Sequence, residues 1–148
     1  METIPFDQLD PEDRSLIDAA RAVAETAYAP YSGVRVGAAL RTPSGVVTGS
    51  NVENGAYGST ICAERMAVGR ANARGERSFS AVAVTATGRA LRDGQVVSPC
   101  GACRQVLHEM AHVSGTSTRV LMTAPGTDDV TVASLAELLP LPFDPLPR

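Results

Sequence analysis

Apolar residues recur along this chain with two different periods, and the changes between those periods divide it into helices and strands. From Leu16 to Tyr28 the apolar positions return every three or four residues, which predicts a first helix that ends before Pro30. Asp10 is placed to cap that helix, and Pro11 suits its first turn, where a backbone N–H would have no partner. Further helices are expected over about 62–73, 101–112 and 134–139, the last capped by Ser134.

Short apolar runs between the helical segments predict strands. The runs over 34–40 and 46–52 flank a Pro-Ser-Gly sequence, 43–45, which favours a turn, so we expect a hairpin. The run over 79–86 alternates little, as in a strand that is buried on both faces. Two further strands are expected over 118–123 and 130–133.

Helices that alternate with strands indicate an α/β fold. The order α-β-β-α-β-α-β-β-α predicts a three-layer α/β/α sandwich with a mixed five-stranded sheet. The 148 residues fit one domain, 1–148, and contain neither an internal repeat nor a linker. We interpret residues 1–10 as an N-terminal extension and residues 140–148 as a proline-rich tail.

Composition narrows the classes of function. Hydrophobic residues make up 44% of the chain, enough for a real core, while charged residues make up 20% and the net charge is −3. Nucleic-acid binders concentrate Lys and Arg on one face, so this balance favours a small neutral substrate and no nucleic acid. The acidic N-terminus resembles no secretory signal, and no run approaches the ~20 apolar residues of a membrane span. We therefore expect a cytoplasmic protein without a membrane partner, whose thiols stay reduced.

The three cysteines of the chain lie where two helices are expected to begin. Cys62 opens the segment Cys-Ala-Glu, and Cys100 and Cys103 belong to Pro-Cys-Gly-Ala-Cys. A helix N-terminus lowers the pKa of a nearby thiol, and zinc is the natural ion for a sulfur-rich tetrahedral site. Three protein ligands leave the fourth position to water, as in catalytic zinc sites.

Cys100 and Cys103 alone would also fit half of a structural zinc site or a redox pair. A structural site needs a fourth ligand. The candidate histidines, His108 and His112, come five and nine residues after Cys103, inside the third helix, where a place on the helix face explains them more simply. The lack of a fourth cysteine therefore favours an open, catalytic site.

Several motifs follow one another in a familiar order: Tyr31-Ser32, Val36-Gly37-Ala38-Ala39, Asn51-Val52-Glu53-Asn54, Cys62-Ala63-Glu64-Arg65, Ser98-Pro99-Cys100-Gly101-Ala102-Cys103-Arg104-Gln105 and Leu138-Leu139-Pro140-Leu141-Pro142-Phe143. Together they resemble the cytidine deaminase family, specifically its small homotetrameric branch. The resemblance implies zinc-dependent hydrolytic deamination of cytidine, deoxycytidine or both to the uracil nucleoside and ammonia, a step of pyrimidine salvage. It also implies one Zn²⁺ per subunit, bound by Cys62, Cys100 and Cys103.

The resemblance assigns Glu64 the proton transfers of the reaction. Glu64 would take a proton from water, protonate ring N3 and later help to protonate the departing amine. Three thiolates and one Zn²⁺ carry a net charge of about −1, which weakens the metal's effect on water. In the family's three-cysteine members, the arginine that matches Arg65 hydrogen-bonds ligand sulfurs and compensates this charge. A solvent-facing Arg65 is the alternative.

Asn51 and Glu53 match the family's ribose-binding pair. Two residues apart on an expected strand, they point to the same side. A carboxylate there disfavours a nearby 5′-phosphate, which favours nucleosides over nucleotides. The resemblance adds backbone contacts from Ala63 and Ser98 to the base and the leaving amine. Val34 stands where family members commonly carry a Phe that packs near the base, which leaves room for a modified base.

Three more residues align with positions that reach into a neighbouring subunit's pocket in the tetrameric branch: Gly55, Tyr57 and Phe143. The resemblance therefore implies a homotetramer whose active sites are completed across subunits. The plain alternatives are a loop glycine, a loop tyrosine and a C-terminal core anchor.

Three other functions are alternatives to the deamination of cytidine or deoxycytidine. Deamination of a modified cytosine nucleoside, such as a nucleoside antibiotic, uses the same chemistry, but Asn51 and Glu53 suit an unmodified ribose. Editing of cytosine in nucleic acid needs a basic groove and aromatic platforms, whereas this acidic chain has 4% aromatic residues and no Trp. A non-catalytic zinc module or a redox protein would have the cysteines without the activity.

Overall fold

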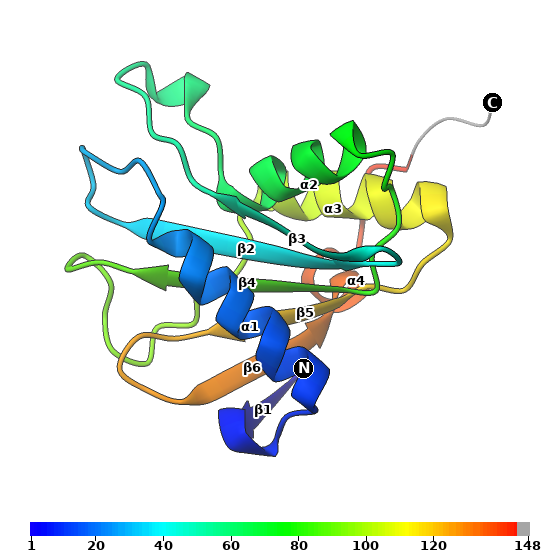
Figure 1. Cartoon of the computed structure of the whole chain (residues 1–148), viewed down its shortest axis with the longest axis horizontal. Helices are drawn as coiled ribbons and strands as arrows, with labels where there is room; N and C mark the ends of the chain where they lie inside the picture. Colours follow the sequence, from blue (N-terminus) through cyan, green and yellow to red (C-terminus); the bar gives the residue numbers. More distant parts are fainter. Residues whose placement is uncertain (145–148) are drawn as a thin grey trace.

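A mixed six-stranded sheet forms the middle layer of the protein in the computed structural model, which describes residues 1–144 (Figure 1). The strand order is β1-β6-β5-β4-β2-β3, with β4 and β5 parallel and every other pair antiparallel. The strands are β1 (Glu2–Pro5), β2 (Arg35–Thr42), β3 (Gly45–Ser50), β4 (Ala81–Thr87), β5 (Arg119–Thr123) and β6 (Asp129–Ser134).

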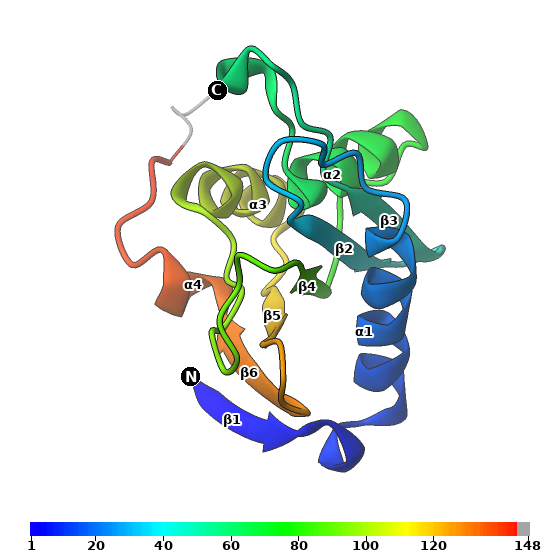
Figure 2. The same cartoon turned by 90° about the vertical axis from the view of Figure 1, so that its left-hand side faces the viewer.

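Helices cover both faces of this sheet, which confirms the predicted three-layer α/β/α architecture. Figure 2 shows α1 on one side of the sheet and α2 and α3 on the other. The helices are α1 (Pro11–Ala24), α2 (Ala63–Ala73), α3 (Gly101–Ser114) and α4 (Leu135–Leu138), and two 3₁₀ turns lie at Phe6–Gln8 and Tyr57–Ser59. Among residues 1–144, no helix combines the length and apolarity that a membrane crossing requires.

Two hydrophobic clusters, one on each face of the sheet, hold these layers together. Strand β2 contributes side chains to both clusters, because successive side chains of a strand point to opposite faces of the sheet. Ala38 and Leu40 pack with α2 and α3, whereas Ala39 packs with Leu16 and Ile17 of α1. This two-sided burial explains why the central strands lack a polar face.

Two glycines let the helices lie directly on the sheet. A Cβ added at Gly37 would come within 1.9 Å of the Ala20 carbonyl oxygen of α1. A Cβ added at Gly49 would lie 2.4 Å from the Ala67 nitrogen and 2.7 Å from the Ala63 oxygen, both in α2. Because these neighbours are backbone atoms, a side chain here would displace a helix. Gly49 thus fixes the distance between β3 and the start of α2.

The expected number of strands was wrong, because residues of the N-terminal extension join the sheet. Strand β1 pairs antiparallel with β6, from Glu2 opposite Val132 to Pro5 opposite Asp129. Of the four residues of β1, only Ile4 has a partly buried side chain, so the segment shows no periodic pattern of apolar residues. Pro5 is tolerated because the strand lies at the sheet edge and has only one neighbour.

Most other boundaries agree with the predictions within a few residues. The first helix is shorter than expected and ends at Ala24, because Tyr28 leaves it to donate its backbone N–H to the Asn51 carbonyl.

Asp10 occupies the N-cap position of α1 but its side chain makes no capping hydrogen bond. Ser134 caps α4 as predicted, in a reciprocal capping box with Glu137. Of the predicted proline-rich tail, residues 145–148 lie outside the described residues.

Candidate metal centre and substrate pocket

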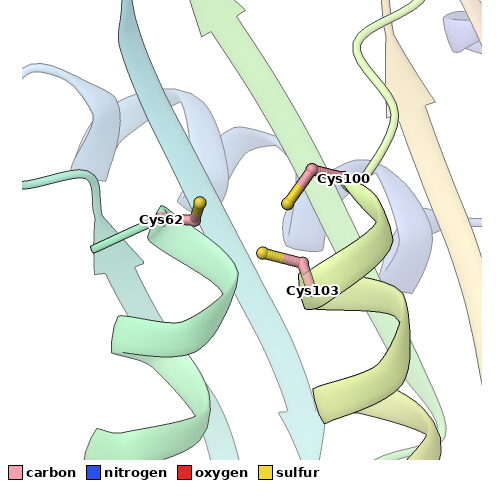
Figure 3. A group of neighbouring side chains, drawn as sticks. All are labelled: Cys62, Cys100 and Cys103. Carbon is pink, nitrogen blue, oxygen red and sulfur yellow. The ribbon is translucent and has the colours of Figure 1, made fainter. Parts of the chain in front are cut away.

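The three cysteines come together at the starts of two neighbouring helices. Cys62 and Cys100 are the N-cap residues of α2 and α3, and Cys103 lies in the first turn of α3. Their sulfur atoms all lie within 4.8 Å of one another. Figure 3 shows the three sulfurs converging on the space between the helix starts. Because the N-terminal ends of helices carry partial positive charge, this is a place where negative sulfurs are stabilised.

Local backbone structure leaves these sulfurs free to bind a ligand. Cys62 and Cys100 both have the extended backbone of N-cap residues, and neither side chain caps its helix. Instead their carbonyl oxygens accept the first helical hydrogen bonds, from the Met66 and Arg104 N–H groups at 3.0 and 2.9 Å. The helices therefore begin without using the thiols.

The chemistry of the thiols fits a divalent cation. Burial raises the pKa of both Cys62 and Cys103, and the neighbouring Glu64 carboxylate raises them further. At Cys100 burial has the same effect, but hydrogen bonds from the Cys103 backbone and from the other two thiols outweigh it and lower the pKa. Three sulfurs so close together need a cation to be ionised at once, and a tetrahedral zinc ion accepts such a donor set. The residues present therefore fit zinc.

Glu64 lies beside the sulfurs, in the first turn of α2, and only 5% of its surface is exposed. Burial raises the pKa of its carboxyl group, and hydrogen bonds from its own backbone N–H and from the Cys103 thiol offset part of that rise. A raised pKa lets a carboxyl group hold a proton more readily than an ordinary glutamate, which suits a general acid–base residue.

Glu64 and the metal centre open into a cavity of about 210 Å³. Val36, Val84 and Val97 contribute apolar walls. Most of the residues that the sequence analysis selected line this cavity: Asn51, Glu53, Cys62, Ala63, Glu64, Ser98 and Cys100. The segment after β3, the start of α2 and the loop before α3 thus supply one pocket.

Glu53 is held in place by the segment before β2. One carboxylate oxygen accepts hydrogen bonds from the backbone N–H groups of Tyr31 and Ser32, at 2.8 and 3.3 Å, and the other accepts from the Ser32 hydroxyl. The Ser32 hydroxyl, followed by the Tyr31 N–H, lowers the pKa of Glu53. No function was predicted for Ser32 from the sequence, although the motif Tyr31-Ser32 was a signal that could have indicated one.

Asn51 lines the pocket, and its amide also forms hydrogen bonds with two backbone groups. Its oxygen accepts from the Val36 N–H at 2.7 Å, and its nitrogen donates to the Val34 carbonyl at 2.9 Å. The amide therefore joins the start of β2 to the end of β3. The expectation that Asn51 and Glu53 share a regular strand is wrong, because β3 ends at Ser50.

Val34 is absent from the lining of this cavity. Gly55, Tyr57 and Phe143, which were expected to reach a neighbouring subunit's pocket, are also absent from it. Tyr57 is 77% exposed and packs edge-on against Tyr31, with 6.3 Å between ring centroids. Phe143 is 74% exposed, so the alternative of a core anchor is wrong. Both rings are available to another molecule.

Arg65 follows Glu64 in α2 and is partly buried. Its Nη2 donates to the Thr60 carbonyl at 2.8 Å, whereas its Nε is buried and has no hydrogen-bond partner among residues 1–144. A buried donor without an acceptor costs free energy unless another group completes the site. This environment contradicts the alternative of a solvent-facing Arg65.

Comparison with known proteins agrees with this geometry. A family model described as "Cytidine and deoxycytidylate deaminase zinc-binding region" matches residues 10–116, most of the chain. This chain belongs to the cytidine deaminase family. It is 42% identical over 129 residues to a cytidine deaminase of Halalkalibacterium halodurans, covering 86% of this chain and 91% of that protein. The fold matches a crystal structure of cytidine deaminase from Burkholderia pseudomallei with a TM-score of 0.77 and 43% identity, covering 91% of this chain and 100% of that one.

The blasticidin-S deaminase of Bacillus cereus is less similar to this chain than the cytidine deaminases above. It is 34% identical over 80 residues, covering 51% of this chain and 57% of that protein. The antibiotic alternative therefore has weaker support than cytidine deamination.

Proposed function

We propose that this chain is a zinc-dependent deaminase of free cytosine nucleosides, which hydrolyses cytidine, deoxycytidine or both to the uracil nucleoside and ammonia. One observation carries the proposal: the buried carboxyl of Glu64, two cysteines of the cluster, Cys62 and Cys100, and Glu53 all border the same cavity of about 210 Å³. Proton transfer, metal binding and recognition of a small polar substrate are thereby combined in one place. The reducing cytoplasm, where the thiols stay free, is the compartment that suits this chemistry.

Zinc bound by Cys62, Cys100 and Cys103 would supply a Lewis acid that makes water a stronger acid. The chain's own groups do the rest. Glu64 takes a proton from the attacking water and delivers it to ring N3, while the water oxygen adds to C4. Glu64 then transfers the second water proton to the exocyclic amine, the C4–N bond breaks and ammonia leaves. Ala63 and Ser98 border the cavity, where their backbone groups can hold the edge of the base.

The substrate class follows from Glu53 as the sugar-binding group. Its carboxylate can accept a hydrogen bond from a ribose hydroxyl in addition to the three from Tyr31 and Ser32, because two carboxylate oxygens accept about four hydrogen bonds. A phosphate beside this carboxylate would add repulsion between like charges.

A substrate panel tests this proposal. Ammonia release should be fast for cytidine or deoxycytidine, and slow for cytosine, CMP and blasticidin S. Turnover of CMP at the nucleoside rate would overturn the assignment of Glu53, and turnover of blasticidin S alone would support the antibiotic alternative.

Removal of the Ser32 hydroxyl should weaken substrate binding without slowing the chemistry, because Ser32 is a positioning residue for Glu53. Ser32→Ala is expected to raise KM for cytidine roughly threefold to tenfold with kcat unchanged, since a hydrogen bond to a charged group is lost. The pKa of Glu53 should rise towards its ordinary value, so the acid limb of kcat/KM should move to higher pH. Ser32→Thr should restore both values. A KM equal to that of the wild type would show that Glu53 needs no such support.

Arg65 is proposed to compensate the excess negative charge of the zinc–thiolate cluster, and its support is the buried Nε, a donor with no partner among residues 1–144. Arg65→Ala should keep the fold but lower zinc affinity by about 10–100-fold, the usual effect of losing a group that supports a metal ligand. Zinc content after dialysis against a chelator measures this. Arg70→Ala, on the exposed part of the same helix, is the control. Unchanged zinc retention and an unchanged pH–rate profile in Arg65→Ala would reject the role.

The homotetramer with shared active sites is also part of the proposal. Its support is the exposure of large apolar side chains around the pocket-forming loops, among them Tyr31, Tyr57 and Ile61. Apolar side chains that are exposed together on one surface often mark a site of contact with another protein. Sedimentation should give a tetramer, and dilution to monomers should reduce specific activity; a fully active monomer would contradict shared sites.

A further inference from the structure

A second cluster of metal-binding side chains lies on α3, away from the cysteines. His108 and His112 are one helical turn apart on the same face of α3, and their ring centroids are 5.9 Å apart. Asp144, in the segment that follows α4, reaches this face. Its Oδ1 lies 2.8 Å from His108 Nε2 and 4.0 Å from His112 Nδ1. One ligand atom from each of the three residues lies within 4.8 Å of the others.

We propose that His108, His112 and Asp144 form a second metal site, for a divalent transition-metal ion such as zinc. The site is separate from the cysteine cluster, because His108 lies five residues beyond Cys103, or about 8 Å along the helix axis. It does not depend on the proposed deaminase activity.

The carboxylate is brought to the histidines by a specific clamp. Gln105 donates from Nε2 to the Phe143 carbonyl at 2.7 Å and accepts the Phe143 N–H at 3.0 Å. Gln105 precedes His108 by three residues, so it lies on the same side of α3. Figure 2 shows the segment after α4 passing beside α3. Two hydrogen bonds therefore fix the residue next to Asp144, and the carboxylate faces the histidines as a consequence of that contact.

The donor set selects the kind of ion. Two imidazole nitrogens and one carboxylate oxygen suit zinc and its neighbours in the transition series, whereas calcium and magnesium prefer oxygen alone. A hollow of about 290 Å³ adjoins both histidines and provides room for water to complete the coordination. The side chains of His112 and Asp144 are 49% and 62% exposed, so the ion would exchange with solvent more readily than one held by the buried Cys103.

A bound ion would join the C-terminal segment to α3. The two elements are already in contact through Gln105, and the metal would add coordinate bonds from both sides of the same junction. Binding at this site should therefore protect the segment around Phe143 from proteolysis as well as take up metal.

Metal titration of the full-length protein, expressed without a polyhistidine tag and already carrying its tightly bound zinc, tests the proposal. Calorimetric titration with Zn²⁺ should detect one further site per chain. His112→Ala and Asp144→Asn should each weaken that site at least tenfold. Glu109→Gln, which removes a charge from the same helix outside the cluster, should leave it unchanged. Cys100→Ala should lose the tight ion and keep the weaker one, which separates this site from the cysteine site.

Three outcomes would overturn the proposal: no uptake of a further ion by the wild type, uptake by His112→Ala and Asp144→Asn equal to that of the wild type, or an equal loss in Glu109→Gln. The last result would mean that general surface charge binds the ion. Circular dichroism of each variant checks that the fold is retained, and His108→Gln provides a second ligand deletion if His112→Ala unfolds.

Discussion

Glu64→Gln should lower kcat for cytidine deamination by about 10²–10⁴-fold, the usual contribution of a positioned general acid–base group. The amide has nearly the shape of the carboxyl group but cannot carry the two protons from water to N3 and to the amine. Two carboxyl groups border the cavity, and their environments shift their pKa values in opposite directions. Burial raises the pKa of Glu64, whereas the Ser32 hydroxyl and the Tyr31 N–H lower that of Glu53. These opposite shifts support the proposal that Glu64 carries the protons and that Glu53 binds the sugar in its ionised form.

Steady-state kinetics with cytidine, together with zinc analysis, measure this effect. The variant should retain its zinc, so that the loss is assigned to proton transfer. Glu76→Gln, which changes a carboxylate that does not border the cavity, is the matched control. A Glu64→Gln protein with wild-type kcat would rule out the proposed mechanism.

Cys100→Ala should remove both the tightly bound zinc and the activity. With one of three sulfurs gone, two protein ligands remain. The loss of zinc affinity should exceed the ~10–100-fold effect of losing a group that only supports a ligand. Cys100 is at the surface end of the cluster, so its replacement disturbs packing less than replacement of the fully buried Cys103 would. Residual turnover should follow residual zinc content.

Elemental analysis after dialysis, followed by chelator competition, quantifies the loss. Gly101→Ala provides the control, because a Cβ at the neighbouring position meets no atom within 4 Å and leaves every sulfur in place. Zinc retained at the wild-type level by Cys100→Ala would mean that the metal is bound elsewhere.

The layers of the fold and the metal centre could be predicted from the sequence because each has a strong local signal. The periods of apolar residues separate helices from strands, and helix starts at Cys62 and Cys100 place the thiols at two helix ends. Strand β1 could not be predicted, because an edge strand of four residues with one neighbour needs no apolar period. Its existence depends on pairing with β6, which is 124 or more residues away in the chain.

The details of the pocket depend on contacts between distant segments, which local patterns do not contain. The sequence did not predict that the amide of Asn51 also bridges backbone groups at the start of β2. Ser32 was not assigned a role, because its contact with Glu53 spans 21 residues. His108 and His112 were interpreted as residues of a helix face. The proposed metal site also needs Asp144, whose approach to that face does not follow from the spacing of residues along the helix.

Zinc-dependent deamination is tested most directly when ammonia and uridine are quantified together, with purified protein of known zinc content and cytidine as substrate. Equal amounts of both products are expected, at a rate proportional to the zinc bound by the cysteine site. A protein that carries this zinc and releases neither ammonia nor uridine would contradict zinc-dependent deamination.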